Sequence, residues 1–196
     1  VVVWQRRAPI DIAMLDPVWL LPVVGHVLVA HAGVRIGHVE TSWLVVGLSL
    51  PAWIIVQGLL VYRNFFTQPL PQCLLPTLTI QIGPARLIFL ALAELQAGLD
   101  PLLRIFYFAG LGTALSLWLP RLPQMLSVPF AMPHWAFSFP LSALASATLA
   151  YAERAASPML WQLGHLLLTV VAGLTAWLTV RTLQVWRAGT FARPEA

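Results

Sequence analysis

Long runs of apolar residues, separated by short polar connectors, dominate this sequence. Each run approaches the length of about 20 residues that a helix needs to cross the hydrocarbon core of a bilayer. Most charged side chains lie at or near the ends of these runs. The pattern predicts six transmembrane helices in one membrane domain over residues 17–187. Their expected ranges are 17–33, 40–63, 76–95, 101–119, 133–152 and 158–185.

The flanking segments are more polar. Residues 1–16 are expected to be the end of a preceding helix followed by a cytoplasmic connector, and residues 188–196 a cytoplasmic tail. The chain opens with Val-Val-Val-Trp and has no initiating methionine. We therefore expect it to be a fragment of a longer protein.

The first, third and fifth predicted helices each contain a proline. These helices hold Pro22 with Gly25, Gly83 with Pro84, and Pro140 after an aromatic run. Proline removes a backbone hydrogen bond, which a membrane helix tolerates when it is buried among other helices or lines a cavity. The fourth and sixth helices are smoother, and the second, which contains Pro51, is intermediate. The alternation indicates three helical hairpins whose broken helices surround a cavity.

The composition places the chain in a membrane. Hydrophobic residues make up 59% and charged residues 9%, with a mean hydropathy of +0.81, whereas soluble domains carry about 25% charged residues. The net charge is +4, but the arginines are scattered and form no basic patch, so we expect no nucleic-acid partner. A single cysteine, Cys73, excludes an intramolecular disulfide. The fold class is therefore an all-α membrane protein surrounded by the lipid bilayer.

The placement of arginine predicts the orientation, because cytoplasmic connectors are enriched in positive charge. One side of the predicted bundle holds Arg6, Arg7, Arg63, Arg121, Arg181, Arg187 and Arg193. The other side holds Arg35 and Arg154 together with the acidic residues Glu40, Glu94, Asp100 and Glu153. Both ends of the chain are therefore expected in the cytoplasm, with the helices in a bacterial-type inner (plasma) membrane.

Two side chains stand out as candidates for function. Phe139 directly precedes Pro140, where a bulky ring could close a narrow pore by blocking and dewetting it, although a buried core aromatic is the commoner role for such a residue. Arg86 places a charge at mid-membrane, at a cost of about 2.5–3.5 kcal/mol on insertion scales. Such a charge normally faces a cavity or a partner, and its alternatives are snorkelling or pairing with a carbonyl.

Enzyme signatures are missing from the sequence. It contains no P-loop, no Gly-x-Ser-x-Gly and no zinc motif. His26 and His31 are five residues apart and lack metal-ligand spacing. We therefore expect no enzyme activity, no catalytic residue, no cofactor and no metal.

Three ordered segments resemble the motifs of a known transporter family. DPVWLLPVVG at residues 16–25 resembles N-P-x-W-F-I-P-V-V-G. LPTL at residues 75–78 and IGPA at residues 82–85 resemble L-P-T-L…I-A-P-P, and WAFSFPL at residues 135–141 resembles W-A-[YF]-[ST]-F-P-L. The chain is thus similar to the tellurite-resistance/dicarboxylate transporter family, which includes TehA-like proteins, fungal malate and sulfite transporters and plant slow anion channels. The resemblance covers essentially the whole chain.

The resemblance implies a TehA-like, ten-helix, quasi-five-fold bundle of which this chain holds the last six helices, as three hairpins. It implies a pore between the broken helices, a gate at Phe139, and a homotrimer for the complete protein. The expected pore-lining or helix-break residues are Pro22, Gly25, Gly83, Pro84, Arg86, Ser138 and Pro140. Arg86 departs from the family pattern, which has alanine at that position.

Three functions remain open at this point. The first is transmembrane transport of small inorganic or organic anions by a channel or channel-like exporter with a phenylalanine-gated pore. The second is a proton-coupled carrier of a C4-dicarboxylate, sulfite or a related anion, for which His26 or His134 would be the titratable group. The third is a truncated fragment or assembly partner that transports nothing.

Overall fold

The computed structural model of the chain describes residues 11–189, which form helices and turns without a strand. Most of the expected N-terminal connector and of the C-terminal tail lies outside the described residues. The same holds for Arg6, Arg7 and Arg193, which contributed to the predicted orientation.

Helices follow one another with short connections. In chain order they are η1 (Ile12–Met14), η2 (Pro17–Leu20), α2 (Leu21–Arg35), α3 (Val39–Phe66), η3 (Gln72–Ile82), α4 (Gly83–Leu95), α5 (Pro101–Thr113), η4 (Ala114–Trp118), η5 (Leu119–Arg121), α6 (Leu122–Ser127), η6 (Met132–Phe137), α7 (Ser138–Arg154) and α8 (Pro158–Arg187). The η segments are 3-10 helices, except that η4 is a π-helical stretch.

The described residues include five helical segments that are long and apolar enough to cross a membrane: Pro17–Arg35, Val39–Phe66, Gln72–Leu95, Pro101–Ser127 and Pro158–Arg187. The predicted all-α membrane fold is confirmed. The remaining predicted helix, over residues 133–152, is divided between the 3-10 helix η6 and the 17-residue α7.

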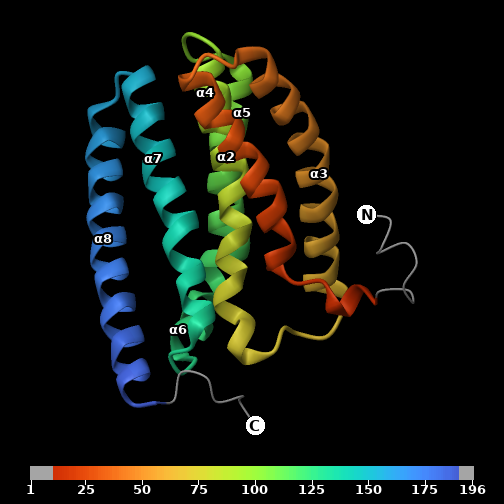
Figure 1. The fold of residues 1–196 in the computed structure, drawn as a ribbon, viewed down its shortest axis with the longest axis vertical. Helices are drawn as coiled ribbons and strands as arrows, with labels where there is room; N and C mark the ends of the chain where they lie inside the picture. Colours follow the sequence, from red (N-terminus) through yellow and green to blue (C-terminus); the bar gives the residue numbers. More distant parts are fainter. Residues whose placement is uncertain (1–10, 190–196) are drawn as a thin grey trace.

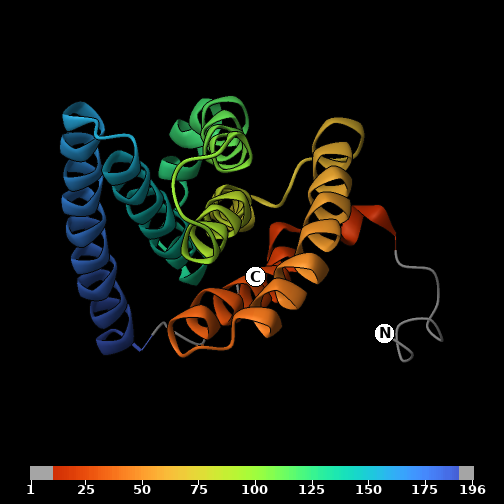
Figure 2. The same cartoon turned by 90° about the horizontal axis from the view of Figure 1, so that it is seen from above.

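Sequential helices pair with each other: α2 with α3, α4 with α5, and α7 with α8 (Figure 1). Seen from above, the α4–α5 pair lies in the middle, and α3 and α8 lie at opposite edges (Figure 2). Burial follows this arrangement, because 78% of the Gln72–Leu95 window is buried against only 17% for Val39–Phe66 and for Pro158–Arg187. The α4 span is therefore the centre of the bundle, and the apolar outer faces of α3 and α8 suit contact with lipid.

The main hydrophobic core joins α2, α4, α5 and α7. Its members include Val27, Phe89, Leu103, Tyr107 and Ala147, all of them buried. Because α4 contacts both α2 and α7, this core sets the spacing of the three helices that the sequence predicts to be broken.

Each of these inner helices changes type along its length. η2 passes into α2, η3 into α4 and η6 into α7, and Pro22, Pro84 and Pro140 lie in the first turn of the α-helical part. Proline fits there because the first N–H groups of an α-helix have no partner within the helix. What the sequence shows as a break inside a helix is therefore a junction between a 3-10 helix and an α-helix.

The backbone hydrogen bonds at the junctions have the tighter 3-10 spacing. The N–H groups of Leu21, Gly83 and Ser138 donate to the carbonyl groups of the residues three positions earlier. The Val18 and Ile80 carbonyls, which the missing N–H groups of Pro22 and Pro84 leave free, thereby accept a hydrogen bond. The junction thus avoids part of the cost of placing proline in a membrane helix.

The fourth predicted helix is longer than expected. It was predicted to end at residue 119 and to be followed by a loop over residues 120–132, but helical structure continues through η5 and α6 to Ser127. Pro120 and Pro123 each occupy one of the first two positions of a new helical segment. Proline is well suited to that position, so these residues begin helical turns.

Close packing of α8 on α7 at Gly164 generates a prediction. A Cβ atom on Gly164 would lie 2.5 Å from Cδ2 and 3.3 Å from the backbone nitrogen of Leu149. We expect Gly164→Ala to lower stability by about 1–3 kcal/mol, because the two helices must move apart. Thermal denaturation of the purified protein in detergent measures the loss.

Gly173→Ala is the matched control on the same helix, since a Cβ atom there meets nothing within 4 Å. Alanine is the better helix former, so this variant should be as stable as the parent or more so. Equal denaturation temperatures for the two variants would contradict the close approach of α7 and α8.

Candidate functional site

An open cavity of about 990 Å³ lies among α2, α4, α7 and α8. It follows α7 along most of its length, from Phe139 in the first turn to Arg154 at the last residue. Leu87 and Leu90 of α4 line it on a second side. The cavity is therefore bounded by inner helices of the bundle, and its inner wall is apolar.

Phe139 lines the inner part of this cavity. Its ring is half-buried and packs against the main hydrophobic core. The residue lies at the junction of η6 and α7, immediately before Pro140. The structure therefore places a bulky aromatic side chain between the packed core and open space.

A stripe of small residues on α7 forms the middle of the cavity wall. Ser142, Ala143 and Ser146 line it, and the hydroxyl of Ser142 donates to the Ser138 carbonyl at 2.8 Å. Ala145 and Ala147 are fully buried. The small residues of α7 thus leave room on the cavity side and allow close helix packing elsewhere.

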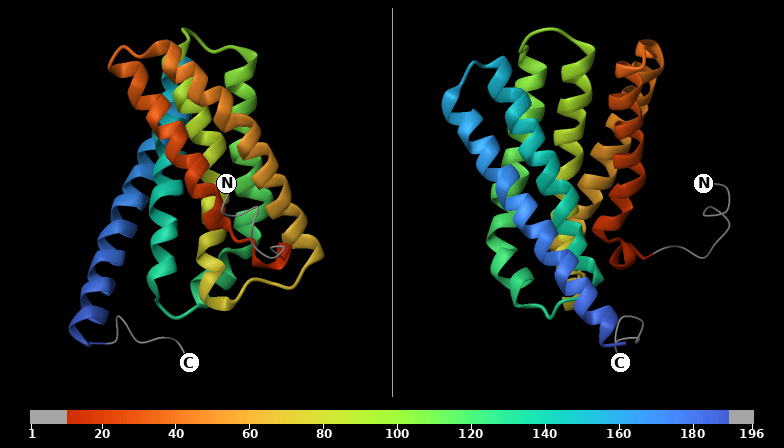
Figure 3. Two further views of the ribbon diagram at one scale, coloured as in Figure 1. Left: turned by 45° about the vertical axis from the view of Figure 1, so that its right-hand side comes forward. Right: turned by 60° about the vertical axis from the view of Figure 1, so that its left-hand side comes forward.

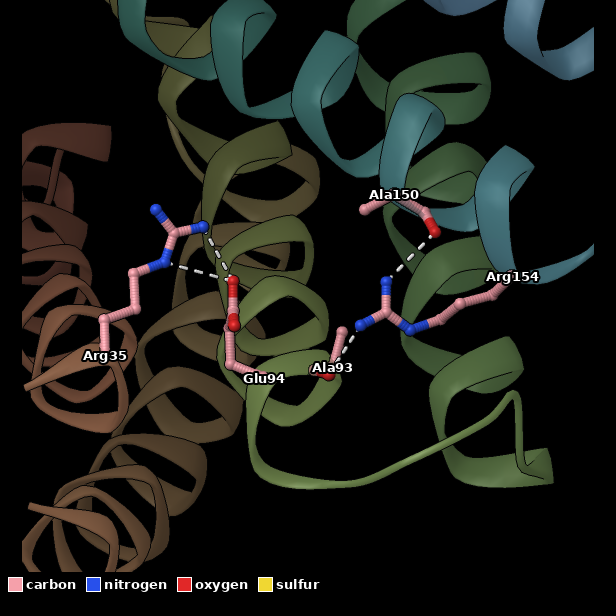
Figure 4. A network of polar contacts seen from close by, with 5 residues as sticks. All are labelled: Arg35, Ala93, Glu94, Ala150 and Arg154. Atoms are coloured by element: carbon pink, nitrogen blue, oxygen red, sulfur yellow. Dashed lines mark hydrogen bonds and ion pairs between the residues drawn. The ribbon is translucent and has the colours of Figure 1, made fainter. Parts of the chain in front are cut away.

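The mouth of the cavity carries an ion pair between α2 and α4 (Figure 4). Nε and one terminal nitrogen of Arg35 donate to Oε1 of Glu94, at 3.2 and 2.7 Å. The two side chains are 64% and 31% exposed. An exposed pair of this kind contributes only about 0–1 kcal/mol to stability, so its main effect is on the charge of the mouth.

Arg154 connects α7 to the end of α4 at the same mouth (Figure 4). Its guanidinium donates to the carbonyl of Ala93 at 2.6 Å and to that of Ala150 at 3.2 Å. Carbonyls in the last turn of a helix lack partners within that helix and attract a cation. Arg154 therefore remains a positive charge on the cavity wall, with no carboxylate hydrogen-bonded to it in the described part of the chain.

Further titratable groups surround the mouth. His31, Glu153 and His165 also line the cavity. Nδ1 of His31 has no hydrogen-bond partner among the described residues, whereas Nδ1 of His165 lies 2.9 Å from the Trp161 carbonyl oxygen. Within residues 11–189 no group of three or more potential ligands is arranged to hold a metal ion.

The structure brings together only some of the residues predicted from sequence. A Cβ atom on Gly83 would lie 3.9 Å from Cβ of Pro140, so two helix junctions meet in the buried centre. Ser138 belongs to the same junction and donates its hydroxyl to the Trp135 carbonyl at 2.7 Å. Pro22 and Gly25 are exposed on α2 and do not contribute to the cavity that Phe139 lines.

Arg86 and Phe139 do not share a cavity. The Arg86 side chain is fully buried between α4 and α5 and does not line the Phe139 cavity. The guanidinium carbon lies 5.4 Å from the centre of the Tyr107 ring, and the guanidinium nitrogens have no hydrogen-bond partner among the described residues. Gly110 leaves the space for it, since a Cβ atom there would come within 2.7 Å of Nε. The missing side chain of Gly110 thus gives Arg86 a slot between the helices, away from the cavity.

The charged mouth was not recognised as a site from the sequence. Arg35, Glu94 and Arg154 were used only to predict orientation, yet each lies at or next to the C-terminal end of an inner helix. This shared position at helix ends could have indicated the site from the sequence, because the inner helices end on the same side of the bundle (Figure 1).

An all-α membrane protein with proline-containing inner helices, a cavity between them and a charged mouth has the architecture of a transporter or channel. The sequence profile of the voltage-dependent anion channel family, SLAC1, matches residues 1–183. The chain belongs to this family.

Curated relatives come from archaea and plants. The chain is 30% and 29% identical to two uncharacterised transporters of Methanocaldococcus jannaschii, in each case over 74% of this chain and 48% or 49% of the relative. It is 26% identical to an S-type anion channel, SLAH2, of Arabidopsis thaliana, over 76% of this chain and 28% of the relative. The chain thus spans about half the length of the archaeal relatives and less of the plant one.

A water-accessible cavity predicts a specific labelling pattern. In a background with Cys73→Ser, we expect Ser142→Cys to react with a membrane-impermeant thiol reagent, because Ser142 lines the open cavity. Ala145→Cys lies on the same helix at a fully buried position and should stay unlabelled. Mass spectrometry of the modified protein measures both. Equal labelling of the two cysteines would show that the wall facing water is not the one described.

Proposed function

We propose that the complete protein moves small anions across the membrane through a pathway that includes this cavity, with Phe139 as the gate. The observation that carries the proposal is the position of Phe139, half-buried at a helix junction and exposed to the cavity. Membership of the voltage-dependent anion channel family and the likeness to a plant S-type anion channel support anions as the substrate class.

Gating by Phe139 follows from its surroundings. Small residues, Ser142 and Ala143, line the cavity within one turn of the ring. A ring that projects into a narrow apolar passage blocks it and removes water, whereas a ring that turns toward the small neighbours opens it. Pro140 restricts the backbone of the gate residue, which favours motion of the side chain over motion of the helix.

Charge at the mouth sets which ions collect there. Arg35 and Arg154 supply positive charge from two inner helices, and Glu94 offsets the first of them. Glu153 adds a second carboxylate to the same wall. Positive charge on low-dielectric walls raises the local concentration of anions, and the carboxylates reduce that effect. We infer that the balance between Arg35 and Glu94 tunes the rate of anion access.

The carrier alternative has a weaker basis than the channel. His26 is exposed on α2 outside the cavity, and His134 is buried with its Nδ1 close to the backbone of Ala131. His31 and His165, which do line the cavity, are the groups that a proton-coupled carrier would use. A role as a non-transporting assembly partner is the remaining alternative.

Orientation and assembly are part of the proposal. The first described element, η1, and the C-terminal end of α8 lie toward one end of the bundle in the side views of Figure 3, as in Figure 1. Arg63 and Arg121 lie toward this end, whereas Arg35 and Arg154 lie at the other. By the positive-inside rule we propose that both ends of the chain lie on the cytoplasmic side of a plasma membrane of the bacterial type. We further propose a homotrimer for the complete protein.

The gate generates the first functional prediction. Phe139→Ala in the complete protein should raise chloride conductance several-fold, because the side chain that blocks the passage is removed. Phe65→Ala, at a 66% exposed position on α3, is the control and should leave conductance unchanged. Recordings from reconstituted planar bilayers measure both. Unchanged conductance in a normally assembled Phe139→Ala protein would rule out the gate.

The charge at the mouth of the cavity generates a second functional prediction. Glu94→Gln should increase chloride current, and Arg35→Gln should decrease it, because each changes the charge of the mouth by one unit in opposite directions. Screening limits such effects, so they should be largest near 0.01 M salt, where the Debye length is about 30 Å, and fade near 1 M, where it is about 3 Å. Equal currents for both variants at low salt would exclude an electrostatic role for this pair.

A further inference from the structure

A second pocket lies at the opposite end of the bundle from the charged mouth. Its volume is about 290 Å³, and it is enclosed by the end of α3, the segment that follows it, η3 and α6. The polar part of its wall consists of Arg63, Asn64, Thr67, Arg121 and Gln124. None of these residues lines the cavity that contains Phe139.

Hydrogen-bond donors in this pocket lack partners. Arg63 is only 4% exposed, yet its Nε has no hydrogen-bond partner among the described residues. The same is true of Nδ2 of the neighbouring Asn64. Buried donors are almost always paired in folded proteins, so two unpaired donors side by side point to a ligand that accepts hydrogen bonds.

Neither arginine of this pocket forms an ion pair within residues 11–189. Arg63 and Arg121 are close enough to repel each other electrostatically. Asp16 attracts Arg63 more strongly than Arg121 repels it, but the Asp16 carboxylate forms no ion pair with Arg63 within 4.0 Å. Over residues 11–189 the one ion pair formed within 4.0 Å is Arg35–Glu94, at the other mouth. The two guanidinium groups therefore share one pocket without a paired carboxylate.

The pocket lies at the depth of the membrane surface. Tyr62, Phe65 and Phe66 flank Arg63 on the last turns of α3, and their rings are 51%, 66% and 72% exposed. Exposed aromatic residues at the end of a membrane span mark the level of the lipid headgroups. A ligand in this pocket would therefore lie beside lipid phosphates and also be accessible from water.

We propose that this pocket binds a phosphate group, held by Arg63 and Arg121. A guanidinium presents a planar fork of donors that matches phosphate oxygens and can bind them in pairs. The amide of Asn64 supplies a further donor. The pocket is separate from the proposed anion pathway, so this site does not depend on transport. The phosphate can come from an anionic lipid headgroup or from free inorganic phosphate.

Binding experiments on the complete protein in a phosphate-free neutral detergent test the site. Native mass spectrometry measures binding of added phosphatidylglycerol, and calorimetric titration measures binding of inorganic phosphate. We expect Arg63→Gln and Arg121→Gln each to weaken binding about tenfold or more, through the loss of one charge-assisted contact. Arg187→Gln, an exposed arginine on α8 outside the pocket, is the control for net charge and should bind like the parent.

The outcomes separate the two sources. Phosphatidylglycerol binding that depends on Arg63 and Arg121 supports a lipid site, and phosphate binding with the same dependence supports a site for the free ion. Absence of both, or an equal loss in Arg187→Gln, overturns the proposal. If Arg63→Gln does not fold because that residue is buried, Arg121→Gln decides alone, since Arg121 is only partly buried.

Discussion

The hydrocarbon core of a membrane contains no water to satisfy backbone polar groups, and the structure depends on this constraint. Three inner helices meet it although each contains proline. Their N-terminal parts are 3-10 helices, and the N–H groups of Leu21, Gly83 and Ser138 use the tighter spacing just before the α-helical part begins. Two of the junctions meet where Gly83 approaches Pro140. The half-buried position of the Phe139 ring follows from that arrangement, because the residue lies on the turn where the helix changes type.

Charge is distributed unequally between the two ends of the bundle. At one end Arg35 is paired with Glu94, and Arg154 is held by backbone carbonyls of α4 and α7. At the other end Arg63 and Arg121 share a pocket with unpaired donors. The first arrangement leaves an open mouth whose wall carries two arginines and two carboxylates. The second favours an anion that stays bound.

The Arg86 side chain occupies space that is free only because residue 110, on the neighbouring helix, is glycine. A buried charge without a partner is costly, and the structure compensates it in part with the face of Tyr107. The Tyr107 ring in turn stacks on Tyr151 of α7, with ring centres 4.1 Å apart. Gly110 is the residue that makes room for this contact. Arg86 thus belongs to the packing of α4, α5 and α7, although its chemistry alone indicated a cavity.

The sequence by itself determined the all-α membrane fold class and drew attention to Phe139, because hydrophobic run length and proline position are local properties. It also indicated which helices are broken, since Pro22, Pro84 and Pro140 mark them directly. Only the tertiary structure decided which side chains share a space. Arg35, Glu94 and Arg154 are far apart in the chain and meet because three inner helices end at one level. Arg86 turned away from the cavity because Gly110, on another helix, leaves a slot. Contacts between helices depend on packing partners, and no pattern along one helix records them.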